Sequence, residues 1–368
     1  MNHHSAADRR YGTLMAVLFN FPITQWTIGV VIRNLQKYPW LWRKIPPLYG
    51  NLVDDLPELQ DFDCPRVIDK QDEPNHPGVQ RWFIASPAMR RIVEVQVIPA
   101  KGSNGPAPML YLLDGVSAPR TSGWLREGQL EQFRSRFDAT IVMPTQAPGS
   151  LYTDWVADDP KVGRHQWDTF LSQELITVIE DPEHGLPYNG KRVIGGLSMG
   201  ASGAIRVAAG HPELYDGVIG LSGCYSNTSP MGRGMTLAIL RSVDADPDNV
   251  WGPDINGQFN PAAYAADILQ NPEGLRNLPL YLFAANGLIT QHDIEIHIGH
   301  PRHEIVGAVF LEYASYRSTR ELVAEMEARG MHHHTVHLQK GGVHAWNYYG
   351  AELVRGWEVV TSHPDFAK

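Results

Sequence analysis

The feature that most constrains the fold is a Gly-Leu-Ser-Met-Gly turn at residues 196–200, centred on Ser198. A short β-branched run, Arg192–Ile194, precedes the turn, and the small residues Ala201–Ala209 follow it in a helical pattern. A strand, a sharp turn and a helix in this order expose a serine hydroxyl, and flanking glycines leave the space that Cβ atoms would fill. The pattern therefore predicts that Ser198 is a nucleophile.

Short apolar runs alternate with amphipathic stretches from about Trp82 onward. The runs predict strands over Ile92–Ile98, Met109–Leu113, Ala139–Met143, Arg192–Ile194, Val218–Leu221, Leu280–Ala284 and Thr335–Leu338. The stretches predict helices over Asp168–Ile179, Ala201–Ala209, Thr319–Ala328 and Tyr348–Val360. Such alternation favours an α/β fold, with a mainly parallel central sheet covered by helices on both faces.

The residues before this region predict an N-terminal extension over 1–81, followed by a catalytic domain over 82–368. Residues 33–80 are rich in Pro, Asp and Trp without a sustained period, which predicts an irregular wrap or linker. Residues 11–32 have no charged side chain, and the stretch is long enough to span a bilayer, which takes about 20 residues. Several polar residues, however, lower its hydrophobicity. We consider a helix packed on the body, an uncleaved anchor, and an atypical export signal without a clear cleavage site. Membrane association through residues 11–32 is one expectation.

Composition excludes several classes of protein. The 368 residues include 31 Lys and Arg against 40 Asp and Glu, a formal charge of -9, so a nucleic-acid partner is not expected. Cys64 and Cys224 form neither a disulfide framework nor a zinc motif. The histidine run 332–334 has no carboxylate or cysteine at ligand spacing, so we expect a solvated helix end, no metal and no cofactor.

A nucleophilic serine needs a histidine base and a carboxylate that orients it, and in folds of this kind the chain order is serine, acid, histidine. The later histidines are 292, 297, 300, 303, 332–334, 337 and 344. His344 follows the last predicted strand across Gly341 and Gly342 and precedes an aromatic-rich helix, which is the loop position a base requires. For the acid, Asp293, Glu295, Glu304 and Glu312 all remain candidates, because sequence spacing does not choose among them.

Several short motifs occur along the chain in the same order as in one known enzyme family. Each motif is short, but the set as a whole is specific to that family. They are Tyr111–Gly115, Val142–Pro144, Ser150–Trp155, Trp167–Leu171, Gly196–Met199, Trp251–Pro253, Asn286–Gly287, Phe310–Glu312 and His344–Gly350. This set resembles the antigen 85 type mycolyltransferases, which belong to the esterase D-like branch of the α/β-hydrolases. The resemblance extends from about Trp82 to Gly356 and implies the α/β-hydrolase fold.

The resemblance also implies a role for individual residues. Ser198 would accept the acyl group, His344 would act as general base and acid, and Glu312, in the matching Phe-Leu-Glu segment, would orient the imidazole. The backbone amides of Met199 and Val116 would form the oxyanion hole. Two residues align with positions that contact sugar in the family, namely Asp114 and Trp346.

The implied activity is transfer of a long-chain, mycolyl-type acyl group from an acylated trehalose to a sugar hydroxyl, outside the cytoplasm. The alternative is a carboxylesterase of the same fold that hydrolyses an acyl ester. Two departures favour the alternative: Ser117 stands where the family usually has a basic residue, and Gly200 stands where a small side chain is usual. The long N-terminal extension has no counterpart in compact family members.

Overall fold

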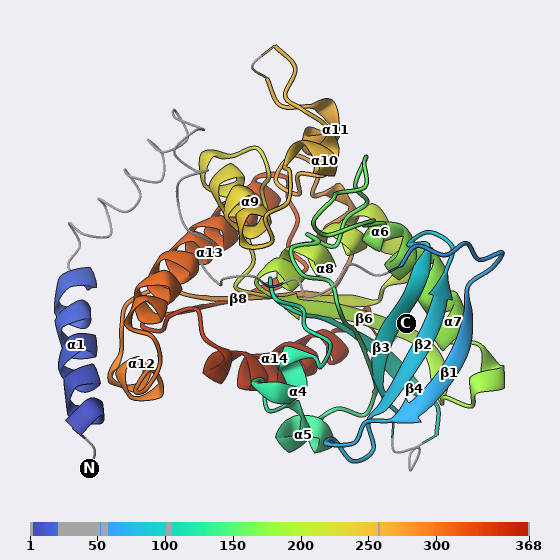
Figure 1. The fold of residues 1–368 in the computed structure, drawn as a ribbon, viewed down its shortest axis with the longest axis horizontal. Helices are drawn as coiled ribbons and strands as arrows, with labels where there is room; N and C mark the ends of the chain where they lie inside the picture. The colour runs from blue at the N-terminus through green and yellow to red at the C-terminus, as the bar shows by residue number, and fades with distance from the viewer. Residues whose placement is uncertain (1–2, 21–51, 53–57, 101–104, 257, 367–368) are drawn as a thin grey trace.

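The computed structural model describes residues 3–20, 52, 58–100, 105–256 and 258–366 (Figure 1). A nine-stranded sheet with the order β1-β2-β3-β5-β4-β6-β7-β8-β9 forms its centre. The strands are β1 (Arg66–Asp72), β2 (Gln80–Ser86), β3 (Arg91–Ile98), β4 (Ala107–Leu113), β5 (Thr140–Pro144), β6 (Tyr188–Leu197), β7 (Gly217–Leu221), β8 (Leu280–Ala285) and β9 (His334–Gln339). Strands β4 to β9 run parallel to one another, whereas β1, β2 and β3 pair antiparallel.

Helices cover both faces of the sheet, which explains why β5, β7 and β8 are buried along their whole length. One face packs against α8 (Met199–Gly210), the end of α13 (Arg302–Ala328) and a continuous helix formed by α6 (Trp167–Thr169), the π-helical η2 (Phe170–Leu175) and α7 (Ile176–Ile179). The other face packs against α4 (Gly123–Arg126), α5 (Leu130–Phe133) and α14 (Trp346–Thr361). Figure 1 shows the two groups on opposite sides of the sheet. The expected α/β-hydrolase architecture is therefore confirmed.

Shorter elements connect these layers. They are the helices α9 (Pro230–Ser242), α10 (Asp248–Trp251), α11 (Pro261–Ala265) and α12 (Gln291–Ile296), and the 3₁₀ turns η1 (Arg134–Arg136), η3 (Pro182–His184), η4 (Pro212–Leu214) and η5 (Glu273–Leu275). Each predicted strand corresponds to a strand of the structure. The predicted helix over Thr319–Ala328 is the second half of α13, which begins at Arg302.

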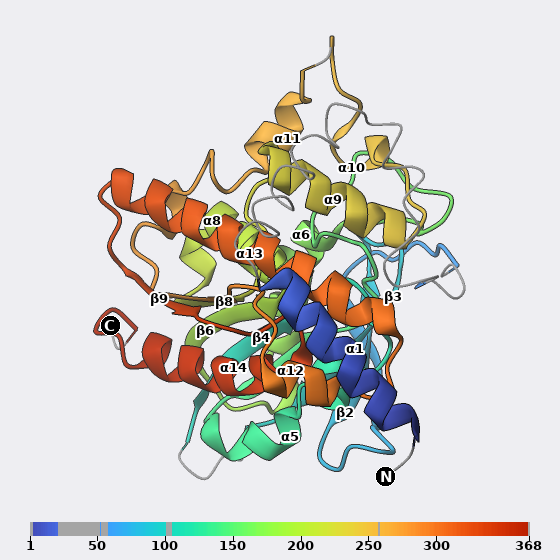
Figure 2. The ribbon, with the colours of Figure 1, turned by 90° about the vertical axis from the view of Figure 1, so that its left-hand side faces the viewer.

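The N-terminal helix α1 (His3–Phe19) lies across α12 and α13 (Figure 2). Its apolar side packs against a small core formed by α12, α13 and the loop before α14, and the Phe19 ring meets Phe310 edge to face. The side-chain Nδ2 of Asn20 donates to the Ile289 carbonyl at 2.9 Å, and its Oδ1 accepts from the Ile289 backbone amide at 2.8 Å. Over residues 11–20 the structure thus shows a helix packed on the body, while residues 21–32 lie outside the described part.

The prediction of an irregular segment over 33–80 is wrong for residues 66–72. Residues 66–72 form β1, which pairs with β2 along the edge of the sheet, so the sheet begins before Trp82. β1 was not predicted because six of its seven residues are exposed and most are polar, so the sequence shows no apolar alternation there. Its stability comes from the β2 ladder rather than from apolar alternation. Residues 33–51 and 53–57 lie outside the described residues.

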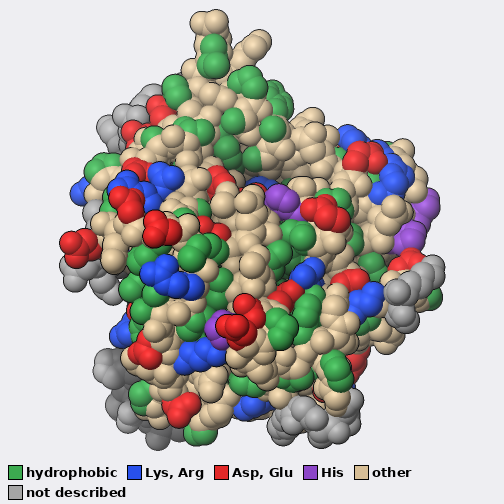
Figure 3. Space-filling view, turned by 90° about the vertical axis from the view of Figure 1, so that its right-hand side faces the viewer, with side chains coloured by type: hydrophobic (Ala, Val, Ile, Leu, Met, Phe, Trp, Pro, Cys, Tyr) green, Lys and Arg blue, Asp and Glu red, His purple; other side chains and the backbone are tan. Residues whose placement is uncertain are grey.

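Within the described residues, no helix has both the length and the apolar character that crossing a bilayer requires. On the face drawn in Figure 3, acidic, basic and hydrophobic side chains are interspersed, and neither sign of charge forms a continuous patch there.

Candidate active site

Ser198 lies between the end of β6 and the start of α8, in a strained backbone conformation with φ 55° and ψ −121°. A positive φ is unfavourable for a residue with a side chain and persists only where neighbouring structure enforces it. The enforcing contact is the close approach of Gly196 and Gly200: a Cβ on Gly196 would lie 2.5 Å from the Gly200 carbonyl carbon. The strain turns the serine side chain out of the sheet, toward a cavity.

Two backbone amides beside Ser198 are positioned to receive negative charge. Met199 is the first residue of α8, and Val116 follows β4 in the loop packed against the serine turn. Among the described residues, neither amide donates a hydrogen bond. The N-terminus of a helix also has a partial positive charge, so these two amides could stabilise an oxyanion.

His344 is held by a buried carboxylate. Its Nδ1 lies 2.7 Å from Glu312 Oε2, and the Glu312 side chain is only 1% exposed. The other oxygen, Oε1, accepts from the Ser222 hydroxyl at 2.8 Å and from the Ala285 amide at 2.6 Å. These donors stabilise a carboxylate that burial would otherwise make costly. With Nδ1 donating to Glu312, the imidazole keeps Nε2 as an acceptor for a proton.

The other candidate acids have different partners. Asp293 caps α12 through Thr290 and accepts from the Tyr348 hydroxyl at 2.7 Å. Glu295 pairs with Arg9 at 2.9 Å, and Glu304 pairs with His300 at 3.2 Å. Of the four carboxylates that the sequence left open, the structure places only Glu312 against His344. Ser222 was not among the residues predicted from the sequence, although its position directly after a predicted strand was a usable signal.

A cavity of about 580 Å³ joins the site residues. Ser198, Val116, His344 and Trp346 line it, and Ser117 faces it as well. The Ser198 hydroxyl makes no hydrogen bond within the described residues, so the structure brings serine and imidazole to one cavity without a recorded contact between them. In unliganded enzymes catalytic hydrogen bonds are often long and shorten when substrate binds.

Another part of the cavity wall comes from the start of α13 and the turn between α12 and α13. His297, His300, His303 and Glu304 line the cavity there. These histidines were weighed from the sequence as possible bases. In the structure they instead provide polar groups to a wall that also contains apolar surface from Ala308 and Leu311.

The two residues predicted to contact sugar differ in position. Trp346 lines the cavity, and its ring meets that of Trp124 edge to face at 5.4 Å. Asp114 is 1% exposed and is not among the cavity-lining residues. Its Oδ2 accepts from the Gly123 amide at 3.1 Å, while its buried Oδ1 has no hydrogen-bond partner among the residues that the structure describes. Burial raises the pKa of Asp114 to about 7.

A mainly parallel sheet with a strand that turns sharply into a strained serine is the architecture of the α/β-hydrolases. The family model described as "Putative esterase" matches residues 86–358, and the chain belongs to this family.

The sequence relatives include acyltransferases. Diacylglycerol acyltransferase/mycolyltransferase Ag85A of Mycobacterium tuberculosis is 30% identical over an alignment of 292 residues that covers 76% of this chain and 80% of the relative. The Ag85B protein of Mycobacterium leprae is 29% identical over an alignment of 293 residues that covers 76% of this chain and 83% of the relative. The resemblance to antigen 85 proteins that the motifs indicated is therefore confirmed. An enzyme that transfers or hydrolyses acyl esters follows from this family membership.

Solved structures agree on the fold. MPT51 of Mycobacterium tuberculosis superposes with a TM-score of 0.61 at 21% identity, over 76% of this chain and 97% of that one. An S-formylglutathione hydrolase from Agrobacterium tumefaciens gives 0.55 at 14% identity, over 80% and 99%. At these identities the likeness extends to the fold alone.

A first prediction concerns the serine turn. A Cβ on Gly200 would lie 2.4 Å from the Asp114 carbonyl oxygen and 2.6 Å from that of Leu113. Because backbone cannot yield as a side chain can, we expect Gly200→Ala to cost about 1–3 kcal/mol of stability or more and to reduce esterase activity by moving Ser198 away from Val116. Thermal unfolding and hydrolysis of a nitrophenyl ester measure the two effects.

Gly210→Ala is the matched control, since Gly210 ends the same helix and a Cβ there would meet nothing within 4 Å. Equal activity in Gly200→Ala and Gly210→Ala would show that the close approach of Gly200 to the Leu113 and Asp114 carbonyls is not needed for activity.

A second prediction concerns pH. In the unfolded chain, Asp114 ionises near the ordinary pKa of about 3.9. In the folded protein its pKa is about 7, so the carboxyl group keeps its proton to a higher pH. The folded state therefore binds more protons in this window, so stability falls as pH rises through it, by at most about 4 kcal/mol. We expect Asp114→Asn to remove this contribution, so that its melting temperature relative to wild type increases from about pH 4 to about pH 7.5. Asp61→Asn, at an exposed side chain, serves as control. Parallel melting curves for wild type and Asp114→Asn across this range would contradict the assignment.

Proposed function

We propose that this protein is a serine acyltransferase that moves a long-chain, mycolyl-type acyl group from an acylated trehalose to a sugar hydroxyl, with Ser198, His344 and Glu312 as its triad. The principal support is the hydrogen bond of buried Glu312 to His344, whose side chain lines the same cavity as the strained Ser198. The antigen 85 relatives, named as diacylglycerol acyltransferase/mycolyltransferase, support the acyl substrate class.

In the first half-reaction, Ser198 Oγ attacks the carbonyl carbon of the donor ester while His344 Nε2 accepts the hydroxyl proton. The carbonyl oxygen becomes negative and receives hydrogen bonds from the amides of Met199 and Val116. Collapse of this intermediate breaks the ester bond, and the imidazolium gives its proton to the departing sugar oxygen. The products are the released alcohol and an acyl-Ser198 ester.

In the second half-reaction, an acceptor hydroxyl takes the place of the departed alcohol. His344 removes its proton as the oxygen attacks the acyl-enzyme, and the same proton returns to Ser198 when the chain leaves. Transfer exceeds hydrolysis only where the acceptor is held near the ester and water is kept away. Trp346 offers a flat face to a sugar ring, and His297 and His300 offer polar groups to its hydroxyls.

The second candidate function is a carboxylesterase with the same triad. It is favoured by Ser117, which lines the cavity at a position where the resemblance implies a basic sugar contact. The acyl-enzyme would then be released by water. In either case we expect action outside the cytoplasm, from the family resemblance, and a lipid ester donor as partner. Membrane association through residues 11–32 stays a prediction.

A third prediction tests the triad. We expect Ser198→Ala and His344→Ala to lower kcat by at least about 10³-fold and Glu312→Gln by roughly 10³–10⁴-fold, because triad members act as a unit. Release of nitrophenol in a pre-steady-state burst should disappear in Ser198→Ala. All three variants should unfold cooperatively.

Glu325→Gln is the matched control, because it changes the same side chain on the same helix and that carboxylate pairs with Arg329, away from the residues that line the cavity. If Glu312→Gln retained wild-type activity, the assignment of Glu312 as the carboxylate of the triad would be wrong.

A fourth prediction separates transfer from hydrolysis. Purified protein supplied with an acyl-trehalose donor and free trehalose should accumulate diacyl-trehalose, with little free fatty acid, because the acceptor sugar occupies the cavity. Mass spectrometry of the lipid products gives the ratio. Free fatty acid as the main product, unchanged by added trehalose, would establish the esterase instead.

A further inference from the structure

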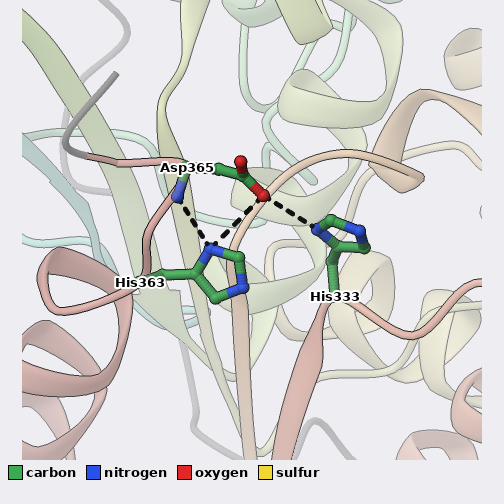
Figure 4. Close-up of side chains that lie close together, drawn as sticks. All are labelled: His333, His363 and Asp365. Carbon is green, nitrogen blue, oxygen red and sulfur yellow. Dashed lines mark hydrogen bonds and ion pairs between the residues drawn. The ribbon is translucent and has the colours of Figure 1, made fainter.

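Two histidines and an aspartate, His333, His363 and Asp365, lie close together although they come from two segments of the chain (Figure 4). His333 directly precedes β9, which is the edge strand of the sheet, whereas His363 and Asp365 lie in the turn after α14. Asp365 Oδ2 is 3.3 Å from His333 Nδ1 and 3.6 Å from His363 Nδ1. The side chains of His333, His363 and Asp365 are 40%, 30% and 29% exposed, so solutes can reach the cluster.

Backbone contacts hold both sides of this cluster in place. The His333 carbonyl accepts from the Leu280 amide at 3.0 Å, which extends the pairing of β8 with β9. The His363 carbonyl accepts from the Phe366 amide at 3.0 Å, and the Phe366 ring packs against the core beneath α14. The three side chains are thus presented by anchored backbone.

The spacing of the three atoms matches what a metal ion requires. Zinc binds imidazole nitrogen and carboxylate oxygen at about 2.0–2.2 Å, so tetrahedral ligand atoms lie roughly 3.3–3.5 Å apart. The two separations from Asp365, 3.3 and 3.6 Å, are close to that value, and one ligand atom from each of the three side chains lies within 4.8 Å of the others. An ion could enter with small side-chain movements.

One hydrogen bond of His363 also fits a ligand role. The Asp365 amide donates to His363 Nδ1 at 3.2 Å, so this nitrogen has the lone pair that a metal needs. An incoming ion would replace the amide as the partner of Nδ1. Imidazole and carboxylate together suit Zn²⁺ and neighbouring transition metals rather than Mg²⁺ or Ca²⁺, which prefer oxygen ligands.

We propose that His333, His363 and Asp365 bind one Zn²⁺-class ion, with water completing the coordination. Asp365 lies about 30 residues after the histidine run in the chain, so only the fold brings this carboxylate to His333. The ion would join the edge strand to the end of α14. Because His344 and Trp346 stand at the other end of that helix, the ion would affect stability rather than the chemistry at Ser198.

The test uses full-length protein freed of metal with a chelator. Titration with Zn²⁺ in a calorimeter should show one site, and its occupancy should raise the melting temperature. We expect His333→Ala, His363→Ala and Asp365→Asn each to weaken binding by at least about tenfold, since loss of even an outer-shell partner costs about 10–100-fold. Each variant should keep wild-type hydrolysis of a nitrophenyl ester when metal-free, which shows that it folds.

Two controls identify the site. His332→Ala removes the neighbouring histidine, and His300→Ala removes one from the catalytic cavity; both should bind Zn²⁺ as wild type does. Absence of binding to wild type, unchanged binding in the three ligand variants, or equal loss in either control would overturn the proposal.

Discussion

The hydrogen bond between Glu312 and His344 is the interaction on which the arrangement of the site depends. A buried carboxylate is costly unless donors surround it, and here the donors come from the ends of two neighbouring strands, through Ser222 after β7 and the Ala285 amide in β8. Parallel strands end at the same edge of a sheet, so these donors converge with the serine turn after β6. The sheet thus fixes both the nucleophile and the acid that orients its base.

Much of this arrangement was predictable from the sequence because it depends on local patterns. The β-branched run, the glycines around Ser198 and the small-residue helix are contiguous, so they identified the serine turn. The identity of the acid was not local. Glu312 lies in the middle of the long helix α13, and only its contact with His344 distinguishes it from Asp293; family resemblance, rather than spacing, selected it.

What the sequence did not predict are features that depend on contacts between distant segments. β1 is a polar edge strand that exists through its ladder with β2, so it has no apolar signature of its own. The approach of Asp365 to His333 likewise requires the whole of α14 to lie against the sheet. Asp114 was predicted to contact sugar, but it is buried because α4 packs against it. No pattern around residue 114 indicates this packing.

The position of α1 has a consequence for anyone who shortens this chain. Tyr11, Met15, Ala16 and Phe19 pack on the small core that also includes Ala308 and Val343. The carbonyl of Ala308 accepts from the His344 amide at 3.1 Å, so this core borders the imidazole loop directly. A recombinant protein trimmed to begin after Asn20 would expose that core to water and loosen the support of the general base, even though every triad residue would still be present.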